Sequence, residues 1–226
     1  MFKEARKFSL VVFIGFLCVS LAGCTVIFQK GRRTDIEKIT QLKSELGELE
    51  RAKAELEDRF KNEIGAKQVK VEMQDKGLVI TFVAEVLFDS GKDKLRSEAL
   101  DKLNIVSHVL NSTVKDLSIG VEGHTDNVPI KFSGWKSNWE LSAARAVSVL
   151  HYLIDSQGID PKRVSATGYG EYHPVDTNDT KEGRQKNRRV EIVILPKTTK
   201  EKNQEPNASV SDVKHEEIQN EEENLK

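Results

Sequence analysis

Residues 117–146 read LSIGVEGHTDNVPIKFSGWKSNWELSAARA, and this segment defines the architecture better than any other. An apolar run at 117–122 is typical of a buried strand, and the polar loop GHTDN follows it at 123–127. Ser137 and Glu140 have the spacing of a capping box, in which each side chain satisfies a free backbone N–H group at the start of a helix. The loop is therefore expected at the carboxyl end of a strand, where side chains can face a ligand.

Further strands and helices are predicted on both sides of this segment. Short apolar runs bounded by turn residues indicate strands, and apolar residues spaced by three and four indicate helices. The expected elements are a hairpin at 69–82 with its turn at Lys76-Gly77, helices at 95–110 and 137–156, and strands at 164–168 and 189–195. This alternation predicts an α/β fold over residues 67–196, in which helices cover a mixed β-sheet as a βαβαβ-type sandwich.

An amphipathic helix is predicted before this domain, at residues 35–66. Its apolar positions follow the 3-4 spacing of a coiled coil of about three heptads. They are Ile39, Leu42, Leu46, Leu49, Leu56 and Phe60, with Lys53 in the remaining core slot. Such a helix would form a homodimer through residues 35–64 and act as a spacer about 45 Å long. A single helix that lies on the domain or on a membrane fits the same pattern, and the spacing leaves both possibilities open.

The N-terminus has the pattern of an export signal. Three basic residues among the first seven precede an apolar run at 8–22, and Leu21-Ala22-Gly23-Cys24 follows. This tetrapeptide resembles the lipobox of bacterial lipoproteins, in which the cysteine thiol receives a diacylglycerol and further acyl chains such as palmitate are added. Residues 1–23 are then a cleaved signal peptide, and residues 24–34 form a lipidated linker.

An uncleaved transmembrane helix is the alternative interpretation of this segment. The apolar run can be extended to Phe28, which gives roughly 20 residues, enough to span a bilayer. The basic residues, the position and the lipobox together favour the lipoprotein. Thr25, where an aspartate would favour retention in the inner membrane, favours the outer membrane, with the protein facing the periplasm.

Composition and charge exclude several classes of protein. The net charge is −1, so there is no overall basic field for nucleic acid. Both cysteines lie near the N-terminus, so the body of the chain contains neither a disulfide framework nor a Cys-rich zinc site. Residues 197–226 are rich in Glu, Lys, Asn and Ser, which predicts a disordered acidic tail.

Two segments of the domain hold the residues best suited to bind a ligand. Asp126 lies in the loop after a strand, while Asn138 and Arg145 are seven residues apart and share one helical face. An arginine can donate two hydrogen bonds to one carboxylate, and an aspartate can hold an ammonium group. The set therefore suits a zwitterion that carries both groups on one carbon. An internal Asp126–Arg145 ion pair is the alternative, and the spacing alone leaves both open.

Four motifs in order resemble the OmpA-like C-terminal domain, which MotB-type and Pal-type proteins share. They are VLFDSGKDKL, GHTDNVPI, SNWELSAARA and GRQKNRRVEI, and the resemblance covers residues 69–195. It implies a domain that binds meso-diaminopimelate in the stem peptides of peptidoglycan. The motif residues implied in binding are Asp126, with Thr125 of the same pair, together with Asn138 and Arg145.

One position departs from the family pattern. Some members have an asparagine in the loop after the Phe-Asp pair, whereas Phe88-Asp89-Ser90-Gly91 has a glycine there. Asp89 and Gly91 are therefore candidate site residues, the latter through its backbone N–H only. Asn187, Arg188 and Arg189 match the family's NRR motif and are expected to brace the surrounding loops.

The sequence favours a wall-binding lipoprotein over an enzyme and over a motor stator. His124 and Asp126 lack a third metal ligand at a recognisable spacing, and no nucleophile motif occurs, so we expect no catalysis, metal or cofactor. A MotB-type stator needs an acidic residue in its membrane helix, and the run 8–28 has none. The favoured function is non-covalent binding of peptidoglycan by a lipid-anchored protein that tethers the outer membrane to the wall. The alternative is a MotB-like inner-membrane stator subunit, or a scaffold that binds other envelope proteins, with the same domain.

Overall fold

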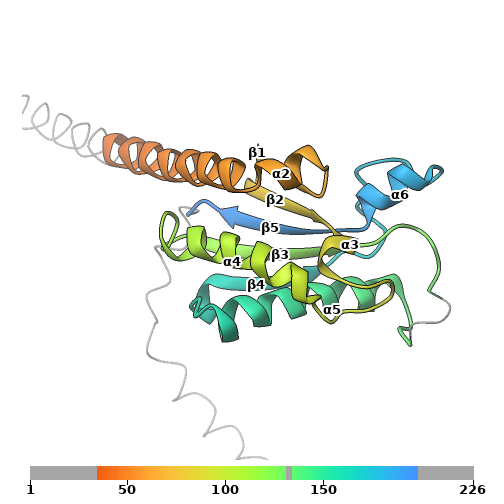
Figure 1. Ribbon diagram of the computed structural model, residues 1–226. Coiled ribbons are helices and arrows are strands. Elements are labelled where there is room, and N and C mark those ends of the chain that lie inside the picture. Colours follow the sequence, from red (N-terminus) through yellow and green to blue (C-terminus); the bar gives the residue numbers. More distant parts are fainter. Residues whose placement is uncertain (1–34, 131–133, 198–226) are drawn as a thin grey trace, which may run out of the picture.

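A five-stranded mixed sheet forms the centre of the fold (Figure 1) in a computed structural model that describes residues 35–130 and 134–197. The strands are β1 (Val69–Gln74), β2 (Gly77–Val83), β3 (Ser118–His124), β4 (Val164–Gly168) and β5 (Arg189–Leu195). Their order in the sheet is β1-β2-β5-β3-β4. Only the β3–β4 pair is parallel among these strands, and β1 and β2 form the expected hairpin. The predicted mixed sheet is confirmed.

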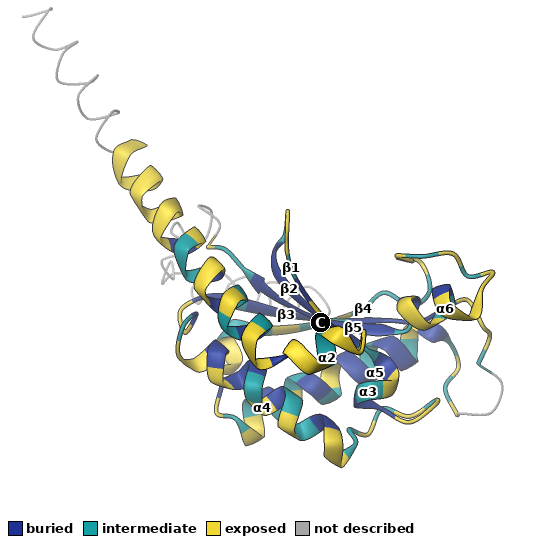
Figure 2. Ribbon diagram, turned by 45° about the horizontal axis from the view of Figure 1, so that its top comes forward, coloured by how far each residue is buried: buried dark blue, intermediate teal, exposed yellow. Residues whose placement is uncertain are grey.

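The α-helices, apart from α6 beyond the ends of the strands, cover one face of this sheet, as Figures 1 and 2 show. They comprise a long helix at 35–59, α2 (Lys61–Gly65), α3 (Ala84–Leu87), α4 (Ser97–Asn111), α5 (Asn138–His151) and α6 (Lys181–Asn187). The side chain of Ser137 accepts a hydrogen bond from the backbone N–H of Glu140, so α5 begins at the predicted cap. Alternate residues of the strands, among them Phe82, Val121 and Ile192, pack with α4 and α5 in one core.

The long helix corrects the expectation of a separate spacer at 35–66. Leu49, Leu56 and Phe60 are buried in the same core as the sheet, and the ring of Phe60 meets that of Phe82 edge to face at 5.8 Å. These residues cannot also form the core of a coiled coil. The physical reason is that the β1–β2 half of the sheet needs an apolar cover. The globular unit therefore includes the C-terminal half of this helix, and its boundary lies well before residue 67.

The N-terminal half of the same helix remains exposed. Ile36, Ile39, Leu42 and Leu46 each expose about half of their surface. Lys53, expected in a core slot, instead pairs with Glu57 on the helix surface. Dimerisation through 35–64 remains a prediction, now confined to this half.

Within the described ranges, no helix is both long and apolar enough to cross a membrane. The predicted signal peptide, Cys24, the linker at 24–34 and all but the first residue of the acidic tail predicted at 197–226 lie outside those ranges.

Two glycines allow α5 to lie directly on the sheet. A Cβ atom at Gly123 would lie 2.0 Å from the backbone oxygen of Ser142, and one at Gly168 would lie 2.5 Å from the backbone nitrogen of Ala143. We expect Gly123→Ala to lower the free energy of unfolding by about 1–3 kcal/mol or more, because backbone must shift to admit the methyl group. Gly120→Ala is the matched control, since the nearest atom to its new Cβ would lie 3.8 Å away. Urea unfolding of both variants checks this, and equal stability would contradict it.

Candidate functional site

A cavity of about 670 Å³ opens where the loop after β3 meets the start of α5. The loop after α3 and the region around α6 complete its wall. Among its lining residues are all six predicted ligand-binding residues: Asp89, Gly91, Thr125, Asp126, Asn138 and Arg145. The ionisable lining residues are the cations Lys92, Arg145, Lys181, Arg184 and Arg188 and the acids Glu85, Asp89 and Asp126. With five cations against three acids, the cavity suits a ligand with net negative charge.

Arg145 is fixed in the wall of this cavity. Its side chain is buried, and it donates hydrogen bonds from Nε to the Lys92 carbonyl (2.9 Å) and from Nη2 to the Asp89 carbonyl (3.3 Å). The guanidinium also lies over the Phe88 ring, 5.2 Å from its centre. Burial lowers the pKa of Arg145, but a guanidinium stays charged. Nη1 has no hydrogen-bond partner within 35–130 and 134–197, so this edge of the group remains open to a carboxylate.

Asp126 is paired with Arg188 and not with Arg145. Its Oδ2 accepts a 2.7 Å hydrogen bond from Nη1 of Arg188, and its Oδ1 accepts one from the backbone N–H of Val128. Arg188 also binds Glu85, and although burial opposes the shift, these two hydrogen bonds raise the pKa of Arg188. The internal Asp126–Arg145 pair that the spacing left open is not formed between these described residues. Arg188, expected only to brace loops, therefore lies in the cavity itself.

Asn138 and Thr125 connect the loop after β3 to α5. The Asn138 amide donates to the Asp126 carbonyl at 3.2 Å and to the Glu171 carboxylate at 2.5 Å. Thr125 donates its backbone N–H to Gly170, while its hydroxyl is buried without a partner among the described residues. Thr125 is nevertheless among the residues that line the cavity.

Asp89 and Gly91 contribute backbone to the site. The Asp89 carbonyl accepts from Arg145, while its carboxylate is largely exposed. Gly91 has a φ of 67° and its carbonyl accepts the Trp135 indole N–H at 3.0 Å. This left-handed conformation favours glycine and also tolerates asparagine.

Asn187 and Arg189 lie behind the cavity and hold the loop after β4. The Asn187 side chain is fully buried and accepts hydrogen bonds from the backbone N–H groups of Val175 and Asp176. Arg189 binds Glu191 at 2.6 Å and the carbonyl of His173. Both therefore fix loop geometry without reaching the cavity.

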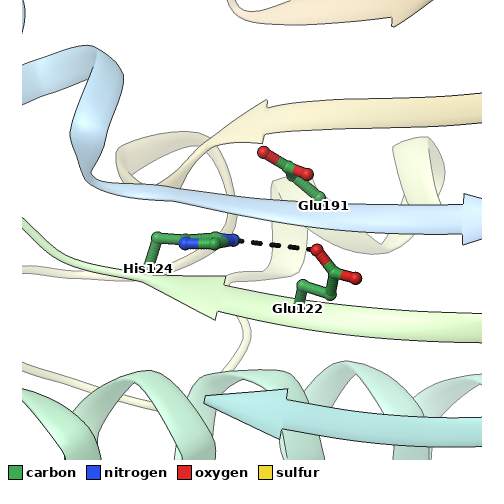
Figure 3. A group of neighbouring side chains, drawn as sticks. All are labelled: Glu122, His124 and Glu191. Carbon is green, nitrogen blue, oxygen red and sulfur yellow. Dashed lines mark ion pairs between the residues drawn. The ribbon is translucent and has the colours of Figure 1, made fainter. Parts of the chain in front are cut away.

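His124 lies in a polar cluster on the sheet face opposite the helices (Figure 3). Its ring is buried next to the carboxylates of Glu122 and Glu191, and neither ring nitrogen has a hydrogen-bond partner among the described residues. These three side chains could together hold a metal ion, but the group does not include Asp126, which sequence spacing pairs with His124, and Glu191 comes from another strand. However, the Lys76 ammonium is bound to both carboxylates at 2.6 Å and already supplies the cation. Arg189, which binds Glu191 at 2.6 Å, supplies a second cation, so the two carboxylates are balanced within the cluster.

The buried histidine makes stability depend on pH. Burial, followed by the charge of Arg189, lowers the pKa of His124 from 6.5 to about 3. Below pH 6.5 the unfolded chain therefore binds a proton here that the folded chain does not, so acid favours unfolding. We expect about 2 kcal/mol of the unfolding free energy to be lost between pH 7 and pH 5 through this group. His124→Phe keeps the ring that stacks on Tyr169 and should remove this loss. Urea unfolding at both pH values tests this, and an unchanged pH dependence in the variant would contradict it.

Comparison with known proteins gives this geometry a context. The sequence signature of the OmpA family matches residues 87–188, which include the whole region from Phe88 to Arg188. Motility protein B of Bacillus subtilis is 43% identical over 157 residues, 70% of this chain and 60% of that protein. The Escherichia coli protein named "Probable lipoprotein YiaD" is 32% identical over 140 residues, 62% of this chain and 61% of its own length. The chain thus spans about three fifths of both relatives.

A solved structure supports the fold and the sequence match together. The cell wall anchor of the T6SS from Pseudomonas aeruginosa superposes with a TM-score of 0.57 and is 36% identical. The match covers 63% of this chain and 97% of the anchor. Almost the whole anchor domain therefore has its counterpart here.

Proposed function

The chain belongs to the OmpA family, and from this premise we propose that it binds peptidoglycan non-covalently by holding meso-diaminopimelate of the stem peptide in the cavity beside α5. One observation carries the proposal. The fixed guanidinium of Arg145 and the carboxylate of Asp126 line the same cavity from two different elements. The cell wall anchor from Pseudomonas aeruginosa, named for its attachment to the wall, supports the same function.

The two charged groups match the two ends of an amino acid. The open Nη1 edge of Arg145 would donate to the ligand carboxylate, and Asp126 would accept from the ligand ammonium. Arg188 donates its hydrogen bond to Oδ2 of Asp126. The other oxygen, Oδ1, accepts from the backbone N–H of Val128 and keeps a further lone pair that can accept from the ligand ammonium. Arg188 thus orients the carboxylate and balances its charge before the ligand arrives. The excess of cations around the cavity suits the further carboxylates of a stem peptide.

Binding requires no chemistry on the ligand, so we propose a non-catalytic role. The cavity would supply recognition only, through charge-assisted hydrogen bonds that are roughly twice as strong as neutral ones. No cofactor or metal enters this function.

The direct test is co-sedimentation of the chain with purified sacculi, with free meso-diaminopimelate as competitor. We expect the protein to pellet with sacculi and the competitor to release it. Full-length chain should be used, because a fragment that begins at residue 67 would lack Leu56 and Phe60 of the core. Failure of the folded chain to pellet would contradict the proposal.

We further propose that the chain is lipid-anchored at Cys24 in the outer membrane and links it to the wall. The lipobox at 21–24 and the similarity to a relative named as a lipoprotein support this anchor. A MotB-like stator or scaffold is the second candidate, and the 43% identity to motility protein B favours it. The absence of any Asp or Glu from residues 8–28 opposes a stator, which needs an acid in its membrane helix.

Lipidation gives a prediction that separates these candidates. Mass spectrometry of the protein from native membranes should find a mature chain that begins at Cys24 and carries acyl chains. Cys24→Ala should leave the chain unprocessed or release it from the membrane, because each buried CH₂ contributes about 0.8 kcal/mol to anchoring. An intact Met1 in native membranes would contradict the lipoprotein and favour the stator-type anchor.

A further inference from the structure

Two aromatic rings stack on the surface beside the cavity. Trp139 follows the cavity residue Asn138 in the first turn of α5, and Tyr172 lies in the loop after β4. Their ring centres are 5.1 Å apart and their planes differ by 22°. Even when stacked, Trp139 exposes 48% of its surface and Tyr172 exposes 62%. Large aromatic surface left open in this way commonly marks a binding site.

The loop that carries Tyr172 is held firmly against α5. Gly170 donates its N–H to the Ser142 hydroxyl at 3.0 Å, and its carbonyl accepts from Thr125. Its left-handed φ of 57° favours glycine at this bend, and a Cβ there would lie 3.4 Å from the Trp139 ring. The next residue, Glu171, accepts from the Asn138 amide at 2.5 Å. Hydrogen bonds of the neighbouring residues Gly170 and Glu171 therefore hold the aromatic pair beside the cavity before a ligand binds.

The chemistry of the pair suits a sugar better than an aliphatic protein surface. Within the ranges that the structure describes, neither the indole N–H of Trp139 nor the hydroxyl of Tyr172 makes a hydrogen bond. The platform thus combines flat apolar faces with unused polar atoms at its edges. A pyranose has the complementary form, with C–H bonds on its face and hydroxyl groups around its rim.

We propose that the Trp139–Tyr172 platform binds a sugar ring of the glycan strand whose stem peptide occupies the cavity. This inference rests on the proposed function. In peptidoglycan two residues lie between meso-diaminopimelate and the sugar, so three residue steps separate them, an extended span of about 10 Å or more. Asn138 of the cavity and Trp139 of the platform are consecutive residues of α5, so the platform adjoins the cavity and one ligand can reach both. The charged groups of the stem peptide would be bound in the cavity, and the sugar would add apolar contact with the two aromatic rings.

The test compares two probes on the full-length chain. One is a free stem tripeptide that ends in meso-diaminopimelate, and the other is the same peptide on its disaccharide. We expect the wild type to bind the disaccharide form more tightly. Trp139→Ala and Tyr172→Ala should each weaken binding of that form by about three- to tenfold and leave binding of the free peptide unchanged. Tyr172→Phe, which keeps the ring, should retain most of the additional affinity for the disaccharide form.

The matched control is Val147→Ala, which shortens another exposed apolar side chain of the same helix outside the platform. This variant should bind the free stem peptide and its disaccharide form as tightly as the wild type does. If both probes bind the wild type equally, or if the alanine variants lose both probes alike, the platform proposal is overturned while wall binding through the cavity stands. If the wild type binds neither probe, the proposed function fails and this inference fails with it.

Discussion

Arg145→Ala is expected to weaken binding of a meso-diaminopimelate stem peptide by about tenfold to a hundredfold or more. A hydrogen bond to a charged group contributes about 1.5–3 kcal/mol, and the guanidinium would supply two of them to one carboxylate. Arg145→Lys should fail as well, because an ammonium cannot make the forked contact. Asp126→Asn, which keeps the shape of the side chain, should weaken binding similarly through loss of its charge. Calorimetric titration of each variant measures these effects.

Folding must be checked in the same variants. Arg145 binds the carbonyls of Lys92 and Asp89, so its removal also loosens the loop after α3. Circular dichroism and urea unfolding show whether each variant remains native, and Asp126→Asn retains most local contacts. Folded Arg145→Lys and Asp126→Asn variants that bind as well as wild type would refute the assignment of the site.

Phe60→Ala is expected to lower the free energy of unfolding by about 3–5 kcal/mol. The ring is fully buried between the long helix and the sheet, where it meets Phe82 edge to face. Its loss leaves a cavity that the rigid sheet cannot close. A helix that acted only as an external spacer would tolerate this change. Urea unfolding followed by circular dichroism measures the difference.

Leu42→Ala on the same helix is the matched control. Leu42 exposes 51% of its surface, so its removal should change stability by less than about 0.5 kcal/mol. Equal effects at positions 42 and 60 would show that the helix does not pack on the sheet as described.

Much of the fold could be predicted from the sequence because its signals are local. The Ser137 cap, the apolar alternation of β1 and β2, and the 3-4 spacing of α4 each reflect contacts between near neighbours in the chain. The four family motifs also identified the cavity residues in advance, since Asp126 and Arg145 line the same cavity. The short helices α3 and α6 were missed, because a helix of four to seven residues carries little periodicity.

The partners of these residues could not be predicted in the same way. The 3-4 spacing of Leu49, Leu56 and Phe60 shows that one face of the helix is apolar, but it does not show what covers that face. Asp126 and Arg188 are 62 residues apart and are brought together only by the sheet order. The charged cluster of Lys76 and Glu191 likewise depends on pairing between strands distant in sequence.

The most direct test of wall recognition compares two stem tripeptides that differ by a single carboxylate. One ends in meso-diaminopimelate and the other in lysine, which has the same chain length and ammonium group but lacks the second carboxylate. Titrated into the full-length chain by calorimetry, the lysine peptide should bind at least about tenfold more weakly, because the open edge of Arg145 loses its partner. Equal affinity for the two peptides would contradict the account.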